Sequence, residues 1–313
     1  MKKKASVGMV GLGIMGSAMA ANLVRAGFEV IGADPVADCR RRHRRAGGRV
    51  AHDAADVARQ ARTIITSLPS ARALARVAED IALNAKAKTL VIETSTMPIA
   101  VKEAARRRLA KAGVVMLDCP LSGTGAQAVT GDLAVYGSGD RAALRKVAPV
   151  LRGFSRAQYD LGAFGNGSKM KFAANLLVAI HNVSAAEAVL LARRSGLDPA
   201  LAVKILGDGA GSSRMLQVRG PMMAARRYRP ATMKNEVWQK DMKIIGDFVR
   251  DCGSVAPLFQ ATKAIYRATL AKLSQADTAA VCAVLEARAT SGLPSRSTRR
   301  GVRRDRRSPP RRR

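Results

Sequence analysis

A glycine-rich loop close to the N-terminus constrains the fold of this 313-residue chain more than any other feature. Residues 5–10 are typical of a short buried strand, residues 14–26 of a helix and residues 28–33 of a second strand. The segment between the first strand and the helix has the pattern G-x-G-x-x-G and consists of Gly11, Leu12, Gly13, Ile14, Met15 and Gly16. In this position the pattern predicts a βαβ unit that binds a dinucleotide, and we expect Ile14 and Met15 to line the cofactor with the glycines.

The three glycines and the acid that follows the second strand each have a physical task. Gly11 makes the tight turn, Gly13 lets a pyrophosphate approach the backbone, and Gly16 lets the helix pack closely on the strand. The helix N-terminus offers free N–H groups to the phosphates. Asp34 is placed to accept hydrogen bonds from ribose hydroxyls and to repel a 2′-phosphate. We therefore favour NAD over NADP, although the arginines within residues 40–45 leave NADP open.

Strands and helices continue to alternate through the first half of the chain. Apolar strand patterns at residues 63–68, 89–93 and 114–117 are separated by helical patterns at residues 71–84 and 98–112. Such alternation predicts a mostly parallel sheet with helices on both faces. The fold class is therefore α/β, with an N-terminal doubly wound domain of the Rossmann type.

The pattern changes after a glycine-rich stretch at residues 162–167. A nearly unbroken helical pattern runs from residue 168 to residue 195, and more helices follow at residues 199–206, 213–225, 234–251 and 257–273. These patterns predict an all-α C-terminal domain that is entered through a long interdomain helix. We expect domains at residues 1–165 and 166–290, followed by a disordered Arg-rich tail at residues 291–313.

The formal net charge of +31 raises the question of a nucleic-acid partner. Residues 291–313 hold ten basic residues and one acidic residue, whereas the rest of the positive charge is spread over the body of the chain. Many of the arginines form runs, such as Arg40–Arg42 and Arg106–Arg108, which are typical of solvated helix faces. A nucleic-acid partner is therefore not expected.

The cysteines and the N-terminus bear on the compartment. Cys39, Cys119, Cys252 and Cys282 form no C-x-x-C pair, which favours reduced thiols in a cytoplasmic protein and no metal site. The basic residues 2–4 are followed by a strand pattern rather than by the apolar stretch of a signal peptide. We find no uninterrupted apolar run long enough to span a bilayer.

Four segments carry chemically distinctive residues in a fixed order. They are Gly11-Leu12-Gly13-Ile14-Met15-Gly16, Asp118-Cys119-Pro120-Leu121-Ser122-Gly123, Gly165-Asn166-Gly167-Ser168-Lys169-Met170-Lys171 and Lys240-Asp241. In order and spacing they resemble the motifs of the β-hydroxyacid dehydrogenase family, which includes 3-hydroxyisobutyrate dehydrogenase and tartronate semialdehyde reductase. The resemblance covers residues 5–290. It implies an NAD(P)-dependent enzyme for a small anionic hydroxy acid or semialdehyde, assembled as a homodimer or homotetramer.

The resemblance implies a catalytic lysine near the start of the long helix. The family spacing, counted from Gly165, selects Lys171 rather than Lys169. Asn175 is four residues after Lys171, so both lie on one face of the helix. A neutral lysine in this position accepts the hydroxyl proton as hydride leaves the substrate carbon, and burial must lower its pKa for that role.

Other site residues also follow from the resemblance. Ser122 and Gly123 are expected to hold the substrate carboxylate, Thr124 replaces a second glycine of the family pattern, and Asn175 is expected to contact the substrate. Ala174 stands where relatives often have a polar residue. Four further residues are expected to line the cofactor: Leu68, Pro69, Thr96 and Lys240.

Two alternatives remain open at this point. The first is a catalytically silent dehydrogenase-like module that binds nucleic acid or another polyanion through its basic tail. The second is an imine reductase-like enzyme, although such relatives commonly lack the lysine at the position of Lys171.

Overall fold

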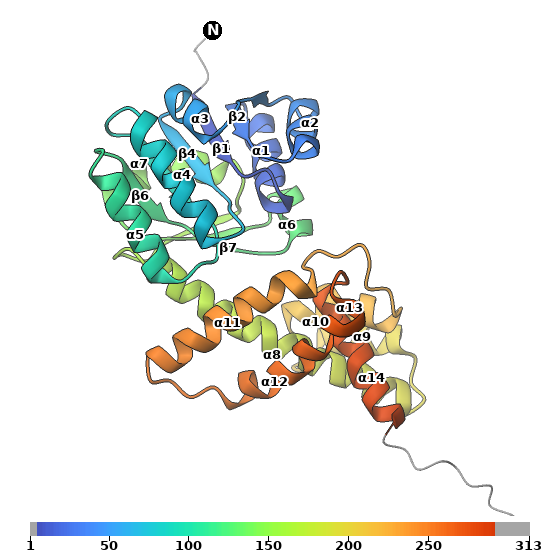
Figure 1. The fold of residues 1–313 in the computed structure, drawn as a ribbon. Helices are drawn as coiled ribbons and strands as arrows, with labels where there is room; N and C mark the ends of the chain where they lie inside the picture. The colour runs from blue at the N-terminus through green and yellow to red at the C-terminus, as the bar shows by residue number, and fades with distance from the viewer. Residues whose placement is uncertain (1–4, 292–313) are drawn as a thin grey trace, which may run out of the picture.

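A six-stranded parallel sheet forms the centre of the N-terminal domain in the computed structural model, which describes residues 5–291 (Figure 1). The strand order is β3-β2-β1-β4-β5-β6, and every neighbouring pair is parallel. The strands are β1 (Ser6–Val10), β2 (Glu29–Ala33), β3 (Arg49–Val50), β4 (Thr63–Thr66), β5 (Leu90–Glu93) and β6 (Val115–Asp118). The parallel sheet predicted from the alternation of elements is confirmed.

Helices cover both faces of this sheet, and alternate residues of each strand supply two separate cores. Val7 and Met9 of β1 pack with α1, whereas Val10 packs with the helices of the other face. One face is covered by α1 (Ile14–Arg25) and α2 (Ala37–Arg45). The other face is covered by α3 (Ala54–Gln60), α4 (Ala71–Asn84) and α5 (Ile99–Ala110).

A second, smaller sheet follows the main one and was not predicted. Its order is β7-β8-β9, with an antiparallel pair β7–β8 and a parallel pair β8–β9. The elements of this part are β7 (Leu121–Ser122), α6 (Gly125–Thr130), β8 (Ala134–Gly137), α7 (Arg141–Arg152) and β9 (Ala157–Asp160). A bridge between Asp118 and Ser138 joins this sheet to the end of β6. Strands of two to four residues are too short to produce a clear periodic pattern.

The C-terminal half is helical, as predicted, and is arranged around the 29-residue helix α8 (Asn166–Arg194). At 1.5 Å per residue this helix is about 43 Å long. It contacts five of the helices that follow. The remaining elements are α9 (Pro199–Asp208), α10 (Arg214–Ala224), α11 (Asn235–Asp251), α12 (Pro257–Ala268), α13 (Leu270–Leu273), η1 (Thr278–Ala280) and α14 (Val281–Ser291). The single helix expected at residues 257–273 is therefore divided at Thr269.

Among the described helices, α8 alone has the length and apolar composition of a membrane span. It nevertheless lies inside the helical domain, where Asn175 and Asn182 are buried and donate hydrogen bonds to neighbouring helices or loops. The packing of the helical domain therefore explains the apolar composition of α8. The Arg-rich tail expected at residues 291–313 lies outside the described residues from residue 292 onward.

Candidate functional site

The loop between β1 and α1 has the geometry that a bound dinucleotide requires. Gly11 has a φ of +93°, and a Cβ there would lie 2.1 Å from the carbonyl oxygen of Ser67. A Cβ on Gly16 would lie 1.9 Å from the carbonyl oxygen of Gly11, whereas the space beside Gly13 is open. Gly13 is the N-cap of α1 and provides no capping side chain. The N–H groups of the first turn are thus available to an anion, so the loop fits a pyrophosphate.

Asp34 closes this loop from the end of β2. Its Oδ2 accepts a hydrogen bond from the Leu12 N–H at 2.7 Å, and its Oδ1 accepts one from the Val36 N–H at 2.8 Å. Each oxygen keeps a free lone pair for a further donor. The guanidinium of Arg40 donates to the carbonyl oxygens of Asp34 and Pro35 at 2.7 and 2.9 Å. A carboxylate and an arginine therefore both lie where an adenosine ribose is expected.

The ends of β4 and β5 complete this edge of the sheet. The Leu68 N–H donates to the Ser95 hydroxyl at 2.8 Å, and Pro69 is exposed at the start of the next loop. The carbonyl oxygen of Thr96 accepts a hydrogen bond from the Lys240 ammonium of α11 at 3.0 Å. The structure thus brings Lys240 from the helical domain to the carboxyl edge of the sheet.

Lys171 lies in the first turns of α8 beside a buried polar group on α11. The Asn175 amide donates to Asp241 Oδ2 at 3.0 Å, and the Lys240 ammonium lies 3.6 Å from Asp241 Oδ1. Burial lowers the pKa of Lys171 to about 8, opposed by Asp241 and assisted by the charges of Lys240 and Lys102. Burial also raises the pKa of the Asp241 carboxyl.

The competing lysine has a different environment. Lys169 is exposed, and its ammonium donates to the Asn166 side chain at 3.1 Å. Two residues along a helix correspond to a rotation of about 200°, which places Lys169 on the far side from Lys171. Lys171, the more buried of the two lysines, has the lowered pKa that proton transfer near neutral pH requires.

The segment after β6 approaches both domains. Ser122 lies in β7, and its hydroxyl has no hydrogen-bond partner within residues 5–291. Gly123 is exposed with a φ of +139°. Thr124 is the N-cap of α6 and forms a capping box with Gln127, so its hydroxyl is already engaged. A Cβ on Gly125 would lie 2.7 Å from the Ile14 side chain, which places this segment against the dinucleotide loop.

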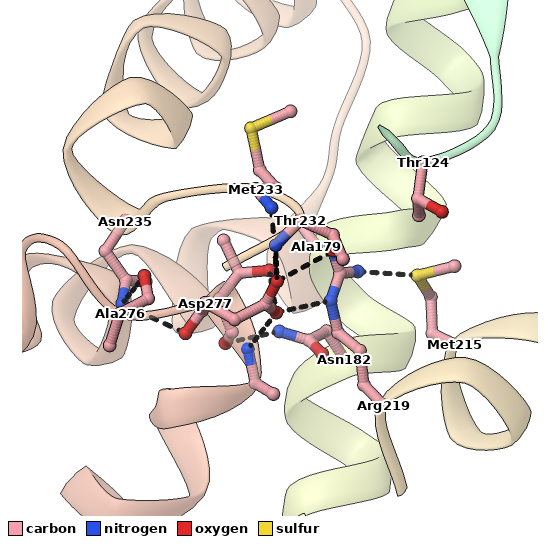
Figure 2. Close-up of polar contacts among 12 residues, drawn as sticks. Thr124, Ala179, Asn182, Met215, Arg219, Thr232, Met233, Asn235, Ala276 and Asp277 are labelled. Atoms are coloured by element: carbon pink, nitrogen blue, oxygen red, sulfur yellow. Dashed lines mark hydrogen bonds and ion pairs between the residues drawn. The ribbon is translucent and has the colours of Figure 1, made fainter. Parts of the chain in front are cut away.

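A buried ion pair orders the part of the helical domain that faces this segment, as Figure 2 shows. The Asp277 carboxylate accepts hydrogen bonds from the Arg219 guanidinium at 3.0 Å, from the Thr232 N–H and hydroxyl at 2.8 Å each, and from the Met233 N–H at 3.1 Å. The Asn235 amide donates to the carbonyl oxygen of Ala276. These bonds hold the backbone immediately before α11, the helix that carries Lys240 and Asp241.

The sequence analysis missed a second buried polar network at the junction of the domains. The Lys102 ammonium lies 2.7 Å from Asp118 Oδ1, and both side chains are fully buried. The Ser168 hydroxyl and N–H donate to the same carboxylate at 2.9 and 2.8 Å. Asp118 was part of a family motif without an assigned role, and Lys102 was not singled out. The available signals were an acid at the carboxyl end of an apolar strand and a lysine on the buried side of a helix.

No cluster of three or more His, Cys, Asp or Glu side chains suited to a metal ion occurs within residues 5–291.

Comparison with protein families divides the chain into two matched parts. Residues 6–164 match the family described as the NAD-binding domain of 6-phosphogluconate dehydrogenase. Residues 165–285 match the family described as NAD-binding of NADP-dependent 3-hydroxyisobutyrate dehydrogenase. Both descriptions refer to a nicotinamide cofactor, which agrees with the geometry of the glycine loop.

The individual relatives are named as dehydrogenases. The chain is 32% identical to an L-threonate dehydrogenase of Cupriavidus necator over 265 residues, which are 83% of this chain and 89% of the relative. It is 36% identical to the mitochondrial 3-hydroxyisobutyrate dehydrogenase of Rattus norvegicus over 67% of this chain and 64% of the relative. The solved structure of 3-hydroxyisobutyrate dehydrogenase from Mycobacterium tuberculosis with L-serine has a TM-score of 0.80 at 28% identity, covering 90% of this chain and 99% of that one.

Proposed function

This chain belongs to the β-hydroxyacid dehydrogenases, a family of NAD(P)-dependent oxidoreductases, and we propose that it uses Lys171 to interconvert a small hydroxy acid and its semialdehyde or keto acid. The observation that carries the proposal is the environment of Lys171. The lysine lies beside Asn175, Asp241 and Lys240, and its pKa is lowered to about 8. A lysine with that pKa exchanges protons readily near neutral pH.

In the proposed reaction Lys171 transfers the proton, and neighbouring residues position the substrate. The bound nicotinamide supplies or accepts the hydride. Lys171 Nζ accepts the hydroxyl proton during oxidation of the alcohol and returns it to the carbonyl oxygen during reduction. Asn175 is held by Asp241 and orients the substrate oxygen, so that the reacting atoms stay aligned.

The carboxylate of the substrate has a site of complementary chemistry. The free Ser122 hydroxyl and the exposed backbone of Gly123 provide donors, and the positive charges of Lys171 and Lys240 attract an anion. Thr124 contributes through its backbone, because its hydroxyl caps α6. This donor set suits a compact 2- or 3-hydroxy acid.

For the cofactor we propose a preference for NAD over NADP. The Asp34 carboxylate retains lone pairs toward the expected ribose position and disfavours a second negative charge there. The Arg40 guanidinium is occupied by backbone carbonyl oxygens, which limits its use for a 2′-phosphate. Leu68, Thr96 and Lys240 complete the cofactor side of the cleft.

The proposal extends to the organisation of the whole protein. Residues 1–165 bind the cofactor, residues 166–290 form the helical domain, and copies of the chain associate in the cytoplasm as a homodimer or homotetramer. Exposed apolar side chains on the helical domain support self-association, among them Leu177, Leu191, Leu201 and Ile205. Light scattering of the full chain measures the assembly.

The two alternatives left open by the sequence are not supported. The relatives are dehydrogenases with a hydroxy-acid substrate in their names, which is unlike a silent module that binds a polyanion. Resemblance to imine reductases is limited to the fold, with 18% identity and a TM-score of 0.60 for an enzyme from Pseudomonas.

The decisive experiment is a substrate panel with NAD and NADP in parallel, applied to the wild-type chain and to Lys171→Met. The panel contains 3-hydroxyisobutyrate, glycerate, 4-hydroxybutyrate and threonate. We expect NAD-linked oxidation of at least one acid by the wild type and a loss of turnover of about 100-fold or more in the variant, the order associated with general acid–base catalysis.

Thermal melting and NAD titration of Lys171→Met provide the control. The variant should melt no lower than the wild type and bind NAD with similar affinity, because methionine removes a charge that burial disfavours. Equal turnover in the two proteins would contradict the role of Lys171, and a preference for NADP would contradict the role of Asp34.

A further inference from the structure

We propose that the buried Lys102–Asp118 ion pair positions Lys171 by fastening the first turn of α8 to the cofactor-binding domain. This inference rests on the proposed function of Lys171. It assigns a task to two fully buried charges that do not touch the expected substrate.

The geometric part of the proposal begins with Asp118. This carboxylate lies at the end of β6 and accepts the Ser168 N–H, in the first turn of α8, at 2.8 Å. A carboxylate in this position satisfies a free N–H and favours the positive end of the helix dipole, as an N-cap does. The cap is supplied here by a residue 50 positions earlier in the chain, since the true N-cap, Gly165, has no side chain.

Further bonds to the same carboxylate make the attachment rigid. Asp118 Oδ1 also accepts the Ser168 hydroxyl at 2.9 Å, and Oδ2 accepts the Ser138 hydroxyl at 3.3 Å. The Gly167 N–H donates to the Ser138 hydroxyl at 3.0 Å. Lys102 provides the counter-charge to this fully buried carboxylate at 2.7 Å.

Close packing supports the same conclusion. A Cβ on Gly167 would lie 2.2 Å from the carbonyl oxygen of Tyr136 and 2.8 Å from that of Asp118. The start of α8 is therefore packed directly on β6 and β8. Lys171 follows Ser168 by three residues and therefore lies in the part of α8 that is fixed to the cofactor-binding domain. Its sequence position nevertheless assigns it to the helical half. The lysine thereby keeps a constant distance to the nicotinamide site if the helical domain moves.

The electrostatic part concerns the charges around Lys171. Lys171 is surrounded by the charges of Asp241 and Lys240 on α11 and of Lys102 on α5, and Lys102 itself contacts the carboxylates of Asp118 and Glu93. The charges of Lys240 and Lys102 lower the pKa of Lys171, and that of Asp241 raises it. Removing the pair should therefore raise the pKa of the lysine.

The first test is the double variant Lys102→Met/Asp118→Asn, which removes both charges of the pair and leaves Glu93, 3.9 Å from the ammonium in the wild type, as the remaining buried charge. We expect the acid limb of the kcat/KM profile for alcohol oxidation to move upward by roughly 0.5 unit, the order of one screened charge. A second readout requires no turnover. Acylation of Lys171 by acetic anhydride, followed by mass spectrometry across pH, reports the same pKa in the cofactor-free chain.

The second test is Ser168→Ala, which keeps every charge and removes one bond between α8 and Asp118. We expect kcat to fall by roughly 10-fold with a smaller change in KM, because a small displacement of the lysine affects the reacting geometry more than binding. This variant should fold even if the double variant does not.

Glu286→Gln is the matched control. Glu286 of α14 pairs with Arg193 of α8 at 3.4 Å. Arg193 follows Lys171 by 22 residues on α8, so the two lie about 33 Å apart along the helix. Its loss should weaken the far end of α8 without moving the pH profile. An unshifted profile in the double variant together with unchanged kcat in Ser168→Ala would overturn the inference. If Lys171→Met is inactive at the same time, the proposed function stands while this inference fails.

Discussion

At the scale of single residues, the role proposed for Lys171 depends on how this lysine is surrounded. The lysine is partly buried and has no ion pair within 4.0 Å among residues 5–291, whereas the nearby Asp241 is held by Asn175 and Lys240. The charge of Asp241 therefore opposes the lowering of the Lys171 pKa without forming an ion pair with the lysine. A lysine that stays fully paired would keep a high pKa and would be a poor base at neutral pH.

The pH dependence of the two reaction directions should be opposite. Oxidation of the alcohol needs neutral Lys171 as the base, so kcat/KM should rise with pH through a value of about 8 and then level off. Reduction of the carbonyl needs the protonated lysine, so its kcat/KM should fall above the same value. Measurements in both directions from about pH 6 to 10 check this, and an oxidation profile that is flat across this range would contradict it.

At the scale of elements, α8 connects the two halves of the protein. Its first turn packs on β6 and β8, and its remaining length forms the axis of the helical domain. The sequence pattern predicted the start of this helix to within two residues and its end to within one. A helical pattern of 29 residues is long enough that single atypical positions do not obscure it. It did not reveal the small sheet β7-β8-β9, whose strands are defined by pairing partners rather than by their own composition.

Alanine at two glycines of the helical elements should have opposite effects. Gly167→Ala places a Cβ 2.2 Å from the Tyr136 carbonyl oxygen, so we expect a loss of about 1–3 kcal/mol in the free energy of unfolding and reduced turnover. Gly207→Ala in α9 meets no atom within 4 Å and should stabilise the chain by about 0.5–1 kcal/mol through helix propensity.

Urea unfolding of the two variants beside the wild type measures both changes. Equal stabilities for Gly167→Ala and Gly207→Ala would show that the start of α8 is not tightly packed on the first domain.

At the scale of the whole molecule, the charges fall into two populations. Most of the lysines and arginines within residues 5–291 contribute to a basic surface, and the ion pairs there are largely exposed. The buried pairs within residues 5–291 are those of Lys102 with Asp118 and Glu93 at the domain junction, and Arg219–Asp277 beneath the segment that precedes α11. The buried pairs hold neighbouring elements together, and the exposed ones contribute little to stability.

This distinction can be measured on one helix. Arg219 and Arg214 both lie on α10, but Arg219 pairs with buried Asp277, whereas Arg214 is exposed and lies 3.3 Å from Asp132 of the first domain. Arg219→Met should reduce the free energy of unfolding by about 3–5 kcal/mol, since it leaves Asp277 buried without a counter-charge. Arg214→Met should change it by less than about 1 kcal/mol. Similar losses in the two variants, measured by urea unfolding, would contradict the division into two populations.

The sequence by itself determined the parallel sheet, the glycine-rich loop and the helical second half, and its resemblance to a family led to the proposal of Lys171 rather than Lys169 as the reactive lysine. Each of these depends on local periodicity or on residues a few positions apart, which a single sequence contains. Only the tertiary structure decided how the lysine is held and charged. Lys102, Asp118 and Ser168 meet across 66 residues of chain, as do Asn175 and Asp241. Such contacts leave no periodic signal, because burial and charge compensation arise only once the separate elements have packed together.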